Sequence, residues 1–336
     1  MRRITTYLVL FCFVGFGLQA QDIHFSQFFA TPLFTNPAFT GHFDATYRFS
    51  GVIRQQWISV SPQPFRTFGG GVDVNGPLGL KPIGVGIHLA QDQAGLSSLT
   101  STHLQIFIAG HIPITSKLKL HLGVSGGGYQ QSIDYSRLSF GDQFNGIRYD
   151  DQLISADPGN RIDNAMFLNV AGGSFLEYKQ SERLRVGLGY ALYNINEPDR
   201  SFNAAYAVIQ QQRHNLHVFS SVPIVAAWDL MPAVQFMRQG TQDELLLGSA
   251  IRYHLSTGPV KPQSVQLGLW GRTADALNVS AGFQTGGLYV GGAYDVNLSS
   301  LQPASRYRGG WEFAVIYTLS TVREKVKRLR QCPDYL

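Results

Sequence analysis

Three things are scarce in this sequence: charged residues, cysteine and long hydrophobic runs. Charged residues make up 15% of the 336-residue chain, against roughly 25% in ordinary globular proteins. So little charge argues against a disordered chain, a coiled coil or a nucleic-acid binder. After residue 20, no segment has the roughly 18 consecutive apolar residues that a membrane-spanning helix needs. The sequence therefore argues against a helical membrane protein as well.

Glycine and aromatic residues are instead abundant. The chain contains 36 glycines, and aromatic residues make up 12% of it. Its 27 basic and 22 acidic residues give a net charge of +5, but segments 1–20 and 321–336 hold all of that excess. The rest of the chain is neutral, which argues against a broad basic face for nucleic acid. A composition rich in glycine and aromatics but poor in charge is typical of a membrane barrel built from strands.

The N-terminus has the layout of a secretory signal peptide. Arg2 and Arg3 precede an apolar run, and Ala20 offers a small residue for cleavage. Cleavage there leaves one cysteine, Cys332, so the mature chain has no intramolecular disulfide. An exported chain without a second hydrophobic helix is either soluble or crosses a membrane as a closed barrel.

The C-terminal part of the chain shows the period of two that is typical of a half-buried strand. From Tyr307 to Leu319, apolar and aromatic residues occupy every second position, with small or charged residues between them. The same pattern recurs in fourteen runs, and it is least regular over 213–238. We therefore predict an all-β fold, a transmembrane antiparallel up-and-down β-barrel of 14 strands within residues 46–320. The expected strands are 46–57, 65–75, 84–92, 101–112, 117–130, 164–178, 184–194, 213–222, 228–238, 244–255, 264–272, 276–285, 288–298 and 306–319.

An even number of strands predicts that both termini lie on one side of the membrane, the periplasm. The two longest connections, near 131–163 and 195–212, then both fall on the outer side. Residues 21–45 are rich in phenylalanine but lack alternation. We interpret them as a periplasmic N-terminal segment, folded across the barrel mouth or into the lumen as a plug, with a mobile leader as the alternative. Residues 321–336 form a basic periplasmic tail, which is either solvated or docks an anionic partner.

Alternation also predicts which charged side chains point into the barrel. An arginine or lysine facing lipid near the midplane costs about 2–4 kcal/mol, so we expect the charged residues to face the lumen and pair there. The predicted inward residues are Arg48, Arg54, Asp73, His88, Asp92, Lys119, Glu177, Arg185, Arg252, Arg272, Asp295, Arg308 and Glu312.

The sequence offers little support for catalysis. Residues 123–127 match the G-x-S-x-G pattern around Ser125, but that chemistry needs a strand-to-helix turn, and no helix is predicted after this run. Four histidines that point inward by alternation invite a metal site, but they lack ligand spacing, and we favour lumen hydrogen bonds for them. These are His88, His103, His111 and His121. We expect a protein that is not an enzyme, with no catalytic residue, no cofactor and no metal.

Several motifs resemble the PorP/SprF family of outer-membrane proteins, over roughly residues 22–320. The N-terminal motif comprises Phe25-Ser26-Gln27 and the stretch Asn36-Pro37-Ala38-Phe39-Thr40-Gly41. The others are Arg54-Gln55-Gln56-Trp57 with the later Pro64 and Thr67, Leu269-Trp270-Gly271-Arg272 with Asp275-Ala276, and Tyr294-Asp295-Val296-Asn297-Leu298-Ser299 with Gly310 and Glu312. Gly271 departs from the pattern, since an aromatic residue is expected there. The ending Asp334-Tyr335-Leu336 also departs from it, which leaves a docking role of the tail without support.

The resemblance implies an outer-membrane barrel that is an accessory of the type IX secretion system. Such a protein supports the export or surface attachment of large cargo, including gliding adhesins. Its partners would be membrane lipids, adhesin-like cargo and other secretion components of the periplasm and outer membrane. The alternative function is a diffusion porin or a small-solute transporter, and an outer-membrane hydrolase comes third.

Within this interpretation we favour a structural task for the motif residues, with recognition of cargo as the alternative. We expect Arg54, Asp295, Asn297 and Glu312 to hold a lumen network where the first and last strands close the barrel. We group Trp57, Arg272 and Asp275 with this network, because they belong to the same motifs.

Overall fold

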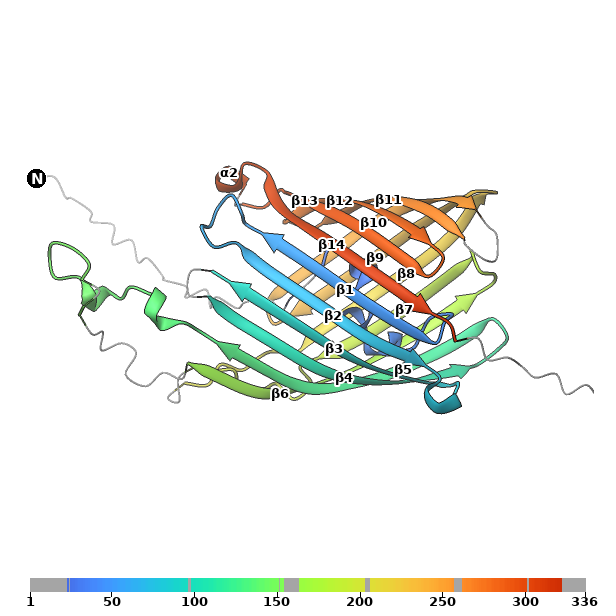
Figure 1. Ribbon diagram of the computed structural model, residues 1–336, viewed down its shortest axis with the longest axis horizontal. Coiled ribbons are helices and arrows are strands. Elements are labelled where there is room, and N and C mark those ends of the chain that lie inside the picture. The colour runs from blue at the N-terminus through green and yellow to red at the C-terminus, as the bar shows by residue number, and fades with distance from the viewer. Residues whose placement is uncertain are drawn as a thin grey trace, which may run out of the picture.

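The protein is a closed barrel of fourteen antiparallel strands (Figure 1), which confirms the predicted all-β fold. The computed structural model describes residues 23, 25–95, 98–150, 152–153, 163–202, 206–256, 262–300 and 302–321. The expected signal peptide and the basic tail beyond Thr321 lie outside these residues. Each strand pairs with its neighbours in the sequence, and β1 pairs with β14 to close the barrel. None of the described helices is long and apolar enough to span a membrane.

All fourteen predicted runs coincide with strands, in the predicted order. The strands are β1 (Tyr47–Gln56), β2 (Phe65–Asn75), β3 (Ile83–Ala94), β4 (Leu99–Pro113), β5 (Leu118–Ser132), β6 (Asn164–Lys179), β7 (Arg185–Tyr193), β8 (Arg213–Val225), β9 (Trp228–Gln239), β10 (Gln242–Ser256), β11 (Gln263–Arg272), β12 (Ala276–Thr285), β13 (Leu288–Asn297) and β14 (Arg308–Leu319). The short helices are η1 (Phe28–Ala30), α1 (Pro32–Thr35), η2 (Pro37–Phe39), η3 (Pro77–Gly79), η4 (Tyr135–Arg137), η5 (Gly141–Gln143) and α2 (Gln302–Ser305).

The irregular pattern of residues 213–238 has a physical cause in two prolines. Pro223 lies next to a shift of register between β8 and β9, and Pro232 lies in the middle of β9. Proline has no backbone N–H to donate to a ladder, so it is tolerated mainly at irregular positions of a sheet. β9 remains a strand despite these prolines because β10 pairs with it along the whole length of β9.

The wall separates an apolar outer face from a polar lining. Leu267 on β11 is 67% exposed on the outside, whereas its neighbour Gln266 is 8% exposed. Arg54 and Glu312 are each 2% exposed and face the lumen. The exception is Arg308, for which alternation predicts the wrong face. A register shift in β14 places it opposite the outward Val296, and its side chain is exposed.

The two ends of the barrel differ. At the end on the left of Figure 1, called here the long-loop end, lie α2 and the two longest connections, 133–163 and 194–212. At the other, the short-turn end, β1 begins and β14 ends. The described chain does not start and finish at the same end. Ile23 lines a cavity at the long-loop end, whereas Thr321 follows β14 at the short-turn end.

Ile23 and residues 25–46, together called here the lumen segment, lie inside the barrel. The segment runs from the long-loop end through η1, α1 and η2 to Thr46, whose backbone N–H donates to Leu319 O at 3.0 Å. Its aromatic side chains are the main apolar contacts of the lumen. Phe28 packs edge-on against Trp270 of β11, with ring centroids 5.2 Å apart, and Phe39 packs against Phe175 of β6 at 4.7 Å. The segment expected at the mouth or in the lumen therefore lies in the lumen.

Candidate functional site

Glu312 joins the lumen segment to the last strand. Its carboxylate accepts two consecutive backbone N–H groups, from Ser26 to Oε2 and from Gln27 to Oε1, each at 2.8 Å. The Gln27 side chain also donates to the backbone oxygen of Glu312 at 3.3 Å. All three residues are buried. Hydrogen bonds to an ionised acceptor are roughly twice as strong as those between neutral groups, so this contact fixes the segment firmly.

Asp295 on β13 is the second carboxylate of the network. It accepts hydrogen bonds from the guanidinium of Arg54 at 3.0 Å and from that of Arg272 at 2.9 Å. The Ser26 hydroxyl donates to it at 2.8 Å, and the amide of Asn278 donates at 2.7 Å. Residues from β1, β11, β12, β13 and the lumen segment thus meet at one buried side chain.

The network also spans the seam of the barrel. Arg54 on β1 lies directly opposite Glu312 on β14, with 4.0 Å between Arg54 Nε and Glu312 Oε2. Two buried arginines face two buried carboxylates, Asp295 and Glu312. An unpaired buried charge is costly, and this balance avoids it. The two arginines are Arg54 and Arg272. We call the group that they form with Asp295, Glu312, Ser26, Gln27 and Asn278 the seam network.

The structure brings together four of the seven residues predicted for this network, and it adds Ser26 and Gln27 of the N-terminal motif to them. Asp275 lies at its edge, where it pairs with Arg272 at 2.6 Å. Trp57 lies outside it, in the connection after β1, with a backbone φ of 61°. Asn297 is also separate: its amide donates to the hydroxyl of Ser305 at 2.7 Å and fixes the connection between β13 and β14.

Asn36 and Pro37 anchor the middle of the lumen segment. The Asn36 amide donates to Ser174 O of β6 at 3.0 Å, and its oxygen caps η2 by accepting the N–H of Ala38 at 2.9 Å. The barrel wall leaves room for this contact because it has glycine at positions 173 on β6 and 123 on β5. A Cβ on Gly173 would lie 2.0 Å from the Asn36 oxygen, and one on Gly123 would lie 2.4 Å from the Pro37 backbone.

Gly41 anchors the segment near the short-turn end. Its N–H donates to the carboxylate of Asp73 on β2 at 2.7 Å, and Asp73 is held by Arg48 of β1 at 2.7 and 2.9 Å. Gly41 has a φ of +72° and lies against Gly84 of β3, so a side chain is excluded both by its backbone conformation and by space. The N-terminal motif residues thus contact the wall at three levels of the barrel.

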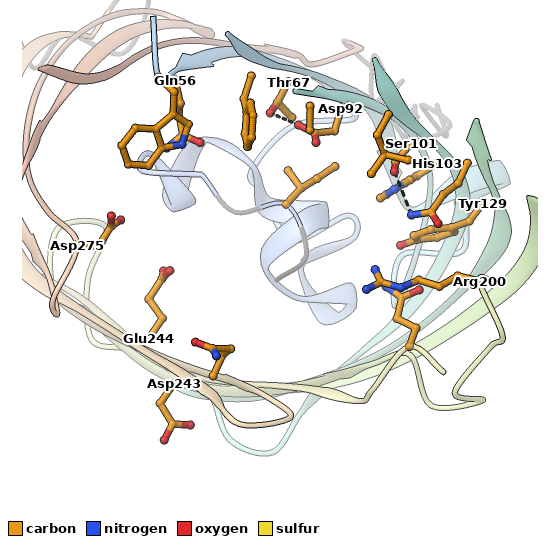
Figure 2. Close-up of a pocket in the computed structure, with 18 of the residues that line it drawn as sticks. Gln56, Thr67, Asp92, Ser101, His103, Tyr129, Arg200, Asp243, Glu244 and Asp275 are labelled. Carbon is orange, nitrogen blue, oxygen red and sulfur yellow. Dashed lines mark hydrogen bonds between the residues drawn. The ribbon is translucent and has the colours of Figure 1, made fainter. Parts of the chain in front are cut away.

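A cavity of about 600 Å³ lies between the lumen segment and the long-loop end (Figure 2). Figure 2 shows Glu244 and Asp275 on one side of it and His103, Tyr129 and Arg200 on the other. The lining is mixed in polarity, with Ile23 and Trp57 beside the charged groups. Of the described chain before β1, Ile23 is the residue that lines the cavity, and Figure 2 shows the short helices of the lumen segment behind it.

The sequence reasoning missed several residues that contact the lumen segment. Arg213 at the start of β8 donates to Ile23 O at 3.1 Å, and Asn215 two positions later donates to Thr35 O at 2.8 Å. Arg213 and Asn215 occupy alternate positions of β8 that face the lumen, and this alternation in the sequence could have identified them. His42 was also missed, because it lies in an aperiodic stretch where alternation gives no direction.

Comparisons with known proteins agree with this architecture. A family model described as "Type IX secretion system membrane protein PorP/SprF" matches residues 17–317. The toluene transporter TodX of Pseudomonas putida is similar in fold, with a TM-score of 0.52 and 10% identity over 89% of this chain and 95% of that one. The toluene transporter TbuX of Ralstonia pickettii has a TM-score of 0.50 and 11% identity over 87% of this chain and 93% of that one. No curated protein matches in sequence. The barrel fold and the family match both support an outer-membrane location.

Proposed function

We propose that this chain, which belongs to the PorP/SprF family of type IX secretion system membrane proteins, is a plugged platform in the outer membrane. In this role it supports the export or surface attachment of large cargo such as gliding adhesins. The observation that carries the proposal is the lumen segment, which is bonded to the wall at three levels. A barrel built to pass solutes freely needs an open lumen instead.

The long-loop end is the surface that we assign to cargo. Its connections expose large apolar side chains: Ile147 is 90% exposed, Tyr206 is 73% exposed and Tyr149 is 60% exposed. Exposed apolar side chains grouped on one face are a common mark of a protein interface. In this proposal the long-loop end faces the outside of the cell, and periplasmic secretion components contact the short-turn end.

A diffusion channel for small solutes is the second candidate, and the 600 Å³ cavity favours it. Planar-bilayer recording of the purified protein separates the two functions. The platform predicts a wild-type barrel with no steady conductance, whereas a variant that lacks residues 25–40 conducts. A steady, solute-sized conductance of the wild type would contradict the platform and support the channel.

The cargo assignment is tested in a strain that lacks this protein. Complementation with the wild type restores cargo at the cell surface, and the double variant Ile147→Ser with Tyr206→Ser restores less, although it inserts and folds. Leu78→Ser is the matched control, because Leu78 is 99% exposed on the connection between β2 and β3, at the short-turn end. Equal surface cargo in the double variant and the wild type would refute the assignment.

A further inference from the structure

Three histidines and a glutamate meet in the lumen near the short-turn end, away from the seam network. His42 Nε2 lies 3.2 Å from Glu177 Oε2, and His121 Nε2 lies 3.9 Å from the same oxygen. One donor atom from each of these three residues lies within 4.8 Å of the others. The fourth residue is His111, whose Nδ1 lies 2.7 Å from Nδ1 of His121.

Different elements supply these side chains. His42 follows η2 in the lumen segment, and Glu177 comes from β6. His111 on β4 and His121 on β5 lie directly opposite each other in the paired strands. The cluster therefore forms only when the lumen segment lies against β4, β5 and β6, which is why it has no ligand spacing in the sequence.

We propose that His42, His121 and Glu177 form a binding site for a divalent transition metal, best suited to Zn²⁺. Imidazole nitrogen and carboxylate oxygen are ordinary zinc ligands, at about 2.0–2.2 Å from the metal. In a tetrahedron of that size the ligand atoms lie about 3.3–3.4 Å apart. The two histidine nitrogens lie 3.2 and 3.9 Å from Glu177 Oε2, and all three ligand atoms lie within 4.8 Å of one another, so side-chain movements that draw the atoms together bring the three ligands to one ion.

His111 prepares His121 for this role. A hydrogen bond between two Nδ1 atoms needs one hydrogen, and when His121 donates it, the lone pair on its Nε2 is free to bind metal. That Nε2 is buried and has no hydrogen-bond partner among the described residues. A metal-binding histidine commonly has its second ring nitrogen fixed in this way by a neighbouring group.

The surroundings suit a partly enclosed metal. The rings of Phe39 and Phe175 pack against His42, with centroids 5.9 and 5.5 Å away, and these rings exclude water on that side. Lys119 lies near the site, opposite Glu177 in the paired strands, and so do Lys179 and Arg185. Lys179 and Arg185 both pair with Asp44, at 3.5 and 3.1 Å. Their charges are therefore partly neutralised before they act on the metal.

Bound metal would clamp the lumen segment to the wall, since one ligand belongs to the segment and two belong to strands. A three-residue ligand set leaves a fourth position for water or a small ligand. This inference does not depend on the proposed function, because a diffusion channel could hold the same clamp.

The test is metal binding by the full-length protein, purified in detergent and stripped with a chelator. We expect one Zn²⁺ per chain by mass spectrometry and the visible absorption of tetrahedral Co²⁺ when cobalt replaces it. His121→Asn and Glu177→Gln should each weaken binding by more than about 100-fold, because even loss of an outer hydrogen-bond partner costs 10–100-fold. His103→Asn is the matched control, since His103 is a buried lumen histidine that stacks on Tyr129.

Two results would overturn the site: no saturable metal binding by the folded wild type, or binding that His121→Asn and Glu177→Gln leave unchanged. If these variants fail to fold, His42→Asn replaces them, because His42 is partly exposed and lies outside the strands. The cobalt spectrum of the wild type is independent of any variant. An octahedral spectrum, or equal loss of binding in His103→Asn, would also contradict the proposal.

Discussion

Glu312 on the last strand accepts the backbone N–H of Ser26, with 2.8 Å between Ser26 N and Glu312 Oε2. The two residues are 286 positions apart in the sequence. Because Glu312 also faces Arg54 across the seam, one side chain serves both the closure of the barrel and the position of the lumen segment. Changes to it should therefore disturb both together.

The first prediction concerns that carboxylate. Glu312→Gln leaves the buried Arg54 without its second opposing charge, and breaking a buried pair costs about 3–5 kcal/mol. We expect the free energy of unfolding to fall by that amount in urea titrations read by heat-modifiable migration in gels. Glu182→Gln is the control, because its side chain is 75% exposed and an exposed ion pair contributes about 0–1 kcal/mol. Normal folding of Glu312→Gln with lost surface cargo would instead indicate a recognition role.

The second prediction ranks two aspartates that share a partner. Asp295 and Asp275 both contact Arg272, but only Asp295 is buried and also pairs with Arg54. Asp295→Asn should lower the free energy of unfolding by about 3–5 kcal/mol. Asp275→Asn should lower it by about 1 kcal/mol or less, because that side chain is 35% exposed and its pair is screened by solvent. Equal losses in the same urea assay would show that the network does not centre on Asp295.

The third prediction tests the fit of the lumen segment. Gly84→Ala would place a Cβ 2.1 Å from the backbone oxygen of Thr40, so the segment must move. Overpacking of this kind costs about 1–3 kcal/mol. We expect lower stability and faster protease cleavage of the segment in the folded barrel. Gly110→Ala should behave like the wild type, since nothing lies within 4 Å of the added carbon. A fully protected segment in Gly84→Ala would contradict the packing described here.

The fourth prediction tests the outer face. Leu267→Arg puts a charge in the middle of the apolar surface of β11, and an arginine at the membrane midplane costs about 2–4 kcal/mol. Near the membrane surface the cost falls to about 0–1 kcal/mol, and Ile114→Arg in the connection between β4 and β5 should show the smaller value. Folding titrations into lipid vesicles measure both. Similar costs at the two positions would place Leu267 away from the lipid core.

Strand positions could be predicted from the sequence because alternation is a local property. Each side chain of the barrel wall faces either lipid or the lumen, and that environment selects its polarity. The runs from β1 to β14 could therefore be recognised without knowledge of the strands that pair with them. Alternation fails where the ladder is irregular. The bulge near Gly309 turned Arg308 to the outer face, and no residue type marks that bulge before the pairing is known.

The seam network could be predicted only in part. Arg54, Asp295 and Glu312 were expected to face inward, whereas Ser26 and Gln27 were given only as part of a separate N-terminal motif. The hydrogen bonds of Ser26 and Gln27 to those carboxylates could not be predicted, because contacts between an aperiodic segment and distant strands leave no local pattern. For the same reason Trp57 and Asn297 were grouped with a network to which they do not belong.

The path of the lumen segment constrains how the protein is assembled. The segment is continuous with β1 at one mouth, yet it is bonded at Ser26 and Ile23 close to the other. If the wall closed first, the segment would have to be threaded through the lumen, and its bulky phenylalanines would have to pass the side chains that line it. Biogenesis should therefore wrap the sheet around the segment, so that insertion, plugging and the joining of β1 to β14 are steps of one event.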